Sequence, residues 1–138
     1  MKKFLTLALT LMVMLTATLF TACKKEPLVV SESDTYVIVK VETDKTDLTL
    51  ANYMASLEDY ADMFVIENGM VVSINGIENA ADWSACWMIY TNDYSEDCSN
   101  AAWGTVEYNG ETFNSASFGA ESLIVKNGCS YIFIYQTF

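Results

Sequence analysis

The fold is decided by residues 64–76, which read FVIENGMVVSING. Asn68-Gly69 separates two apolar runs of this segment, and a second pair, Asn75-Gly76, closes it. Both residues of an Asn-Gly pair tolerate the positive φ that a tight type I′ turn requires. The segment therefore predicts a hairpin about Asn68-Gly69, with strands at residues 63–66 and 70–74.

Further Asn-Gly pairs occur later in the chain. Asn109-Gly110 predicts a second hairpin between strands at 103–108 and 111–113, and Asn127-Gly128 precedes a final strand at 131–136. β-Branched and aromatic residues predict further strands at 36–41 and 86–91. We expect a connecting turn at 77–82, an acidic loop at 92–101 and a short strand or turn at 123–125.

One stretch has helical periodicity. Apolar residues recur every three or four positions from Leu50 to Ala61, which predicts a three-turn helix with one apolar stripe. Thr49 is a suitable N-cap, and Leu48 can pack onto Tyr53 as a hydrophobic staple. A helix with one apolar face needs a sheet to cover, so the expected fold class is α+β, with one helix on five to seven strands.

The first 22 residues have the features of a secretory leader. Lys2 and Lys3 precede an uncharged apolar run, and Cys23 directly follows Ala22, as in the lipobox of bacterial lipoproteins. Residues 1–22 are therefore predicted to be a lipoprotein signal peptide and Cys23 the lipidation site; an uncleaved membrane anchor is the alternative. Residues 23–34 are interpreted as a tether of up to roughly 40 Å. The folded part, residues 35–138, is then extracytoplasmic and lipid-anchored to a bacterial membrane.

The acidic composition limits the classes of partner that are expected to bind this chain. The chain has 18 acidic residues, no histidine and a formal net charge of −11. Nucleic acid is not an expected partner, because phosphate contacts need clustered Lys and Arg. Attachment to a membrane is expected through the lipid on Cys23 and not through surface charge.

Three cysteines remain after Cys23. An odd number in an oxidising compartment allows at most one bridge within the chain. Cys86 and Cys129 both lie beside apolar strands, whereas Cys98 lies in a polar loop, so Cys86–Cys129 is the preferred disulfide and the other pairings stay open. No metal site is predicted, because histidine is absent and no cysteine pair has zinc-ligand spacing.

The order of these elements resembles a known domain. Residues 50–54 (LANYM), 64–67 (FVIE), 69–76 (GMVVSING), 87–90 (WMIY) and 125–128 (VKNG), with Trp83, follow the order of a bacterial domain family of unknown function. That family is similar to the C-terminal domain of transcobalamin and gastric intrinsic factor. The resemblance covers about residues 35–138 and implies a β-grasp-like fold, a mixed sheet gripping one helix.

The resemblance also implies a ligand. In the vitamin carriers this domain covers one side of a corrinoid, so the expected contacts here come from the turn at residues 73–75 and from aromatic rings, which suit a large flat partner. The candidate ligand-binding residues are Trp83, Trp87, Tyr90, Ser73, Asn75 and Trp103. Without histidine, any corrinoid would keep its own lower ligand.

Other interpretations remain open. Trp87 is more easily explained as a core residue of an alternating strand, and Trp83 and Trp103 are better candidates for exposure. Asp93, Glu96 and Asp97 could ligate calcium, although a solvated loop is the favoured interpretation. The sequence favours a non-enzymatic small-molecule binding lipoprotein, with an adhesion or protein-interaction module as the alternative. An enzyme is disfavoured because no histidine is available as a base.

Overall fold

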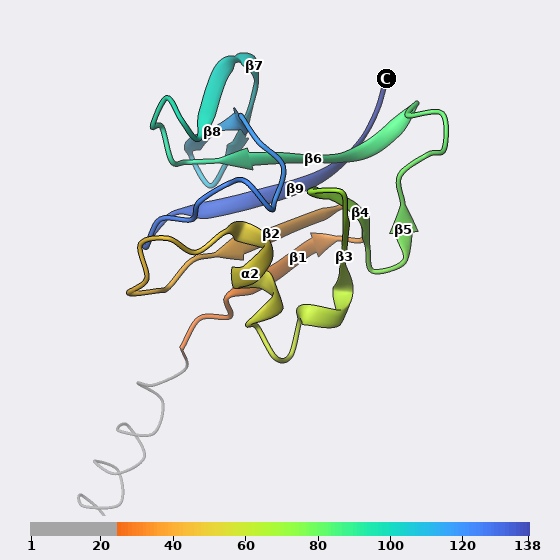
Figure 1. Cartoon of the computed structure of the whole chain (residues 1–138). Helices are drawn as coiled ribbons and strands as arrows, with labels where there is room; N and C mark the ends of the chain where they lie inside the picture. Colours follow the sequence, from red (N-terminus) through yellow and green to blue (C-terminus); the bar gives the residue numbers. More distant parts are fainter. Residues whose placement is uncertain (1–24) are drawn as a thin grey trace, which may run out of the picture.

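The computed structural model describes residues 25–138 as two antiparallel sheets and one short helix (Figure 1). A six-stranded sheet has the order β1-β2-β9-β6-β8-β7, and a three-stranded sheet has the order β3-β4-β5. The strands are β1 (Val29–Ser33), β2 (Tyr36–Lys40), β3 (Phe64–Glu67), β4 (Met70–Ile74), β5 (Ile77–Glu78), β6 (Ala85–Thr91), β7 (Ser99–Tyr108), β8 (Glu111–Ala116) and β9 (Ser130–Thr137).

The turns follow the Asn-Gly pairs. Asn68 and Gly69 have φ values of 52° and 84° between β3 and β4, which is the geometry of a type I′ turn. Asn109 and Gly110 repeat it between β7 and β8. Both predicted hairpins are confirmed. Before β9, only the glycine of Asn127-Gly128 has a positive φ.

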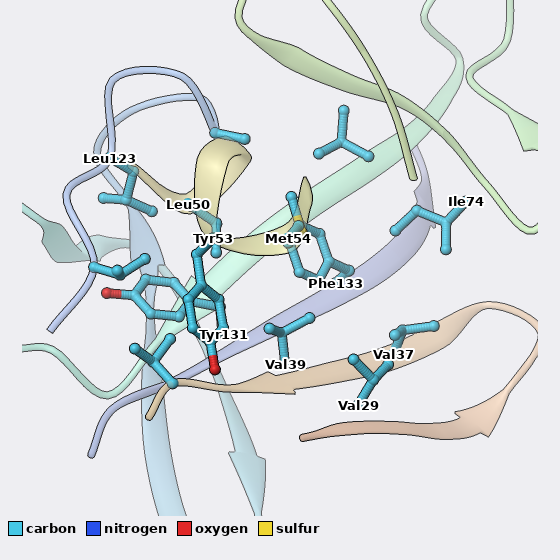
Figure 2. Close-up of a cluster of buried hydrophobic side chains, with 14 of the residues drawn as sticks. Val29, Val37, Val39, Leu50, Tyr53, Met54, Ile74, Leu123, Tyr131 and Phe133 are labelled. Atoms are coloured by element: carbon cyan, nitrogen blue, oxygen red, sulfur yellow. The ribbon is translucent and has the colours of Figure 1, made fainter. Parts of the chain in front are cut away.

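The helix α2 (Leu50–Ala55) lies on one face of the large sheet (Figure 1). Thr49 caps it as predicted, because its Oγ1 accepts a hydrogen bond from the backbone N–H of Asn52. Leu50, Tyr53 and Met54 are fully or nearly fully buried and pack with Val39 and Phe133 of the sheet in the main hydrophobic cluster (Figure 2). An α+β arrangement is therefore present, dominated by its sheets.

The helix is shorter than predicted. It ends at Ser56, whose hydroxyl donates to the carbonyl oxygen of Tyr53 at 2.6 Å, and a 3₁₀ turn, η1, follows at Ala61–Met63. Leu57 and Tyr60 still pack against the core, but from a turn. The three-turn helix was wrong because an apolar spacing of three or four residues is also met by consecutive tight turns.

The β7–β8 hairpin covers the opposite face of the large sheet. The β7–β8 hairpin contributes Phe113 to a second buried cluster with Ile38, Tyr90 and Ile132. Tyr108, at the tip of that hairpin, donates from its hydroxyl to Glu32 of β1 at 2.7 Å. Because β1 and β7 are the two edge strands, this contact shows that the hairpin curls across the sheet.

Several sequence-based expectations need correction. The sheet is not mixed, since every strand pairing among residues 25–138 is antiparallel. The sheet under the helix has six strands, within the five to seven expected, but residues 25–138 also form a second sheet of three strands that was not expected. Two strands that were not predicted are β1, inside the segment 23–34 interpreted as a tether, and β5, inside the connecting turn. The leader and Cys23 lie outside the described residues.

Candidate functional site

Trp83 occupies an unusual backbone conformation just before β6. Its φ is 62°, in the left-handed region that bulky residues rarely adopt. Its N–H donates to the carbonyl of Ala80 at 2.9 Å, and the next residue, Ser84, donates from both N–H and hydroxyl to the carboxylate of Asp82. These hydrogen bonds lower the pKa of Asp82 and hold the turn. The indole is left 53% exposed.

An apolar hollow of about 340 Å³ lies on one side of Trp83. It forms where β6 separates from β8, because these strands pair only at Tyr90 and Thr91. Its residues are mostly aromatic, aliphatic or sulfur-containing and include Met70, Trp83, Cys86, Trp87, Met88 and Phe118. We call this space the apolar hollow.

Trp83 also lines a second hollow, of about 590 Å³. Its lining is more polar and contains three carboxylates, those of Asp62, Glu67 and Glu78, together with Ser73. Trp83 and Asn79 line both spaces. We call this second space the acidic hollow.

Asn79 joins the two sheets beneath Trp83. Its side-chain amide donates to the carbonyl of Val71 on β4 at 3.0 Å, and its side-chain oxygen accepts from the N–H of Trp87 on β6 at 2.8 Å. The side chain therefore links the two sheets, and Asn79 lines both hollows.

A close approach between two backbone segments forms another wall of the apolar hollow. Gly119 packs against the Asn68-Gly69 turn so closely that a Cβ at this position would collide with the carbonyl oxygen of Gly69. This contact brings the loop after β8 next to Met70. Phe118 and Met70, both half-exposed, consequently line the same hollow as Trp83.

The structure brings together only part of the predicted site. Trp83 and Trp87 line the apolar hollow, and Ser73 lines the acidic one. Trp87 is only 5% exposed; its indole donates to the carbonyl of Ile77 at 2.8 Å, so it is mainly a core residue that contributes to the floor. Asn75 lies in the β4–β5 turn and lines neither hollow.

Two predicted residues lie elsewhere. Tyr90 is buried on the other face of the large sheet, where its hydroxyl hydrogen-bonds Gln136. Trp103 is 63% exposed on the outer strand β7, in a bulge between Asn100 and Thr105. Tyr90 lies away from the hollows because it is three residues from Trp87 on the same strand and so points to the opposite face. Trp103 lies away because β8 separates its strand, β7, from β6, and sequence spacing does not reveal that order.

The sequence analysis missed Met70, Asn79 and Phe118. Met70 was assigned to a strand, but its strand lies in the second sheet and so faces β6. Phe118 is a single large apolar residue within a small, polar segment, and such isolation is the signal that could have identified it. Asn79 has no distinguishing local pattern.

The acidic loop at the other end of the large sheet is not simply solvated. Asp93 is only 4% exposed, and its carboxylate accepts from the N–H and hydroxyl of Ser95. Burial by itself raises the pKa of Asp93, but the hydrogen bonds from Ser95 and Cys98 and the nearby charge of Lys126 outweigh it, so the pKa is lowered. Glu96 and Asp97 are exposed, as expected.

The preferred disulfide is wrong, because Cys86, Cys98 and Cys129 are all free thiols. Cys86 is opposite Gln136 on β9, whereas Cys129 directly precedes that strand. Seven residues of strand separate the two positions, roughly 23 Å at about 3.3 Å per residue, while a bridge needs Cα atoms within about 7 Å. Burial raises the pKa of each of the three thiols.

Neither a metal cluster nor a membrane-spanning helix is present in residues 25–138. No group of three or more His, Cys, Asp or Glu side chains there could hold a metal ion. No helix there is long and apolar enough to cross a membrane.

Comparison with known proteins gives no relative to this chain: no family model, no curated protein and no solved structure matches it. The resemblance to the transcobalamin C-terminal domain, and the corrinoid it implies, therefore stay predictions from sequence.

Proposed function

We propose that this protein is a non-enzymatic binding protein that holds a flat, largely apolar small molecule against the indole of Trp83. The observation that carries the proposal is the combination of a left-handed backbone and a half-exposed aromatic ring between two hollows.

The backbone conformation of Trp83 has an energetic cost. A left-handed φ costs a non-glycine residue roughly 1–2 kcal/mol. Exposing an indole at the same position gains nothing for folding, since its apolar surface stays in water. Strain that stability does not explain tends to occur at functional sites, and here it directs the ring between the hollows.

The lining defines the chemistry of the ligand. Met70, Trp87 and Phe118 offer apolar surface for a ring system, and Trp83 offers a face for stacking. The three carboxylates of the acidic hollow disfavour an anion and favour hydrogen-bond donors or a positive charge. The expected ligand is therefore a flat ring with a neutral or cationic polar fringe.

A corrinoid, which the resemblance implies, has this character because its flat ring carries amide arms and a positive cobalt. Its size requires that it lie across Trp83 with a part in each hollow, since the apolar hollow alone is at the lower limit for a drug-sized ligand. The chain has no histidine, so the ligand would keep its own lower base. A β-grasp-like relationship belongs to the same proposal and is supported by the single helix held on the sheet.

The proposal includes a lipid anchor on Cys23 and an extracytoplasmic location. Its support is the leader sequence together with the direction of the strands. The chain enters the sheet at Val29, which pairs with Val39, whereas Ala85 and Thr137 pair at the opposite end, beside Trp83. A lipid at Cys23 would leave both hollows facing away from the membrane.

The test is a titration of the full chain with cyanocobalamin and, separately, with the neutral dye N-phenyl-1-naphthylamine, following tryptophan fluorescence. We expect saturable binding to Trp103→Phe, in which only Trp83 and Trp87 report, and loss of binding in Trp83→Ala. Absence of saturation with both probes at tens of micromolar, or equal binding by Trp83→Ala, would overturn the proposal.

The alternative function, a protein-interaction module, is favoured by one observation. Ala101, Ala102 and Trp103 are exposed on the outer edge of β7, where an extended partner segment could add to the sheet. Cross-linking on intact cells should then capture a partner with the wild type and not with Trp103→Ala. Equal capture by the two proteins would count against this function.

A further inference from the structure

Strand β6 carries two sulfur atoms side by side. Cys86 and Met88 are two residues apart, and alternate residues of a strand point to the same face. The Sγ of Cys86 lies 3.8 Å from the Sδ of Met88. Both residues line the apolar hollow, and Met88 also packs, partly buried, against the cluster of Ile38, Tyr90 and Ile132.

We propose that Cys86 and Met88 form a binding site for a soft monovalent metal ion, Cu(I) or Ag(I). Thiolate and thioether sulfurs are the ligands that such ions prefer over the oxygen ligands chosen by calcium or magnesium. The site shares the apolar hollow with the flat ligand proposed above, but it uses neither Trp83 nor the acidic hollow, so the two proposals can be tested separately.

The spacing of the sulfurs fits joint coordination. With metal–sulfur bonds of about 2.3 Å, the length of a zinc–thiolate bond, sulfurs 3.8 Å apart subtend roughly 110° at the metal. That angle is close to the tetrahedral value and leaves the remaining positions for small ligands from the hollow. The two protein ligands are therefore already at the separation that they need.

The surroundings select against other ions. No carboxylate is among the residues that line the apolar hollow, so hard cations lack the oxygen ligands that they require. Zinc prefers four ligands in structural sites, and this site supplies two. On binding, the Cys86 thiol releases its proton to solvent, one metal–thiolate bond and one metal–thioether bond form, and no atom changes oxidation state.

The other cysteines provide matched controls. Cys98 lies beside Asp93, with the carbonyl oxygen of Ile124 at 4.0 Å from its sulfur, and Cys129 lies at the start of β9. No methionine sulfur is recorded as a partner of either thiol within residues 25–138. A bare thiol would bind the metal equally at any of the three positions, whereas the proposed pair exists only at Cys86.

The test is calorimetric titration of the full chain with silver nitrate in chloride-free buffer, repeated anaerobically with Cu(I) against a chromogenic Cu(I) chelator. We expect one tight equivalent that is lost in Cys86→Ser and retained in Cys23→Ser, Cys98→Ser and Cys129→Ser. Met88→Leu, which preserves volume, should weaken binding by about tenfold or more, since changes around a metal cost at least that much. Trp83→Ala should leave the equivalent intact.

Three results would overturn the site. These are an equivalent that follows Cys98 or Cys129, unchanged affinity in Met88→Leu, and displacement of silver by an equal concentration of zinc. Because Trp83→Ala removes the flat ligand and spares the metal, a failure of one proposal is distinguishable from a failure of the other.

Discussion

The two ends of the six-stranded sheet differ in the hydrogen bonding of their polar groups and in the exposure of their apolar side chains. At the Asp93 end, polar side chains hydrogen-bond backbone groups: the side chain of Asn92 accepts from the backbone N–H of Ser130, and the hydroxyl of Ser99 donates to the backbone carbonyl of Asp93. Tyr131 is the exception. Its hydroxyl is the one buried side-chain nitrogen or oxygen group without a hydrogen-bond partner among residues 25–138, and burial raises the pKa of Tyr131. At the Trp83 end, large apolar side chains are left in water.

The proposed function assigns ligand binding to the Trp83 end and a structural role to the Asp93 end. Hydrogen bonds that are satisfied internally stabilise the Asp93 loop. Exposed apolar surface beside Trp83 contributes nothing to folding until something covers it. Substitutions at the Asp93 end should therefore affect stability, and those at the Trp83 end should affect binding.

The largest expected effect is that of Asp93→Ala. It leaves the N–H and hydroxyl of Ser95 without their acceptor, at a cost of about 2–3 kcal/mol in the free energy of unfolding. The exposed neighbour Glu96 is the control, and Glu96→Gln should change stability by less than about 0.5 kcal/mol. Urea denaturation measures both; equal effects would contradict a structural role for Asp93.

The same carboxylate predicts a pH dependence. Because the folded pKa of Asp93 is lowered, its stabilising contribution is complete above the unfolded value of about 3.9 and is lost as the pH falls through the lower folded value. The difference in unfolding free energy between wild type and Asp93→Asn should thus shrink below about pH 4. A difference that stays constant down to pH 2 would contradict the lowered pKa.

Asn79→Ala should have the next largest effect. It should change both stability and ligand binding, because Asn79 hydrogen-bonds to both sheets and lines both hollows. Losing its bonds to Val71 and Trp87 should cost about 2 kcal/mol and also weaken ligand binding. Asn100→Ala is the control, since Asn100 bonds only the nearby N–H of Ala102 on the surface. Urea denaturation and dye titration of both variants measure the two effects.

A comparison of two substitutions at Trp83 sharpens the contrast. Trp83→Gly should be more stable than Trp83→Ala by about 1 kcal/mol, because glycine adopts a φ of 62° without strain and alanine does not. Both variants should lose ligand binding. At Trp103, where φ is not positive, the glycine variant should have no such advantage. Equal stabilities at Trp83 would remove the strain on which the proposed function relies.

The smallest expected effect is that of Trp103→Ala. Its indole is exposed, so removing it should change the unfolding free energy by less than about 0.5 kcal/mol and leave dye binding unchanged. A loss of dye binding here would place the ligand at β7 and not between the hollows.

Sequence reasoning succeeded where the determinant is local. The Asn68-Gly69 and Asn109-Gly110 turns and the Thr49 cap each depend on residues adjacent in the chain, and each was predicted. The end of the helix at Ser56 was missed because tight turns continue the same apolar spacing. The strand β1 was missed because Val29–Ser33 alternates weakly and gains its pairing from β2.

The candidate site was predicted only in part for the same reason. Trp83 was identified from its own surroundings in the sequence. Met70 and Phe118 join it only because the turn at Asn68-Gly69 packs against Gly119, a contact between segments 50 residues apart in the chain. No local pattern records such a contact.

The position at which β1 begins has a mechanical consequence. A pull on the chain before Val29, opposed by a load held at Trp83, acts along the strand axes, since the two points lie at opposite ends of the sheet. Hydrogen bonds across the β1–β2 and β2–β9 ladders would then be sheared together and would not open one after another. Under the proposed lipid anchoring, tension between Cys23 and a ligand held at Trp83 would therefore load these ladders in shear.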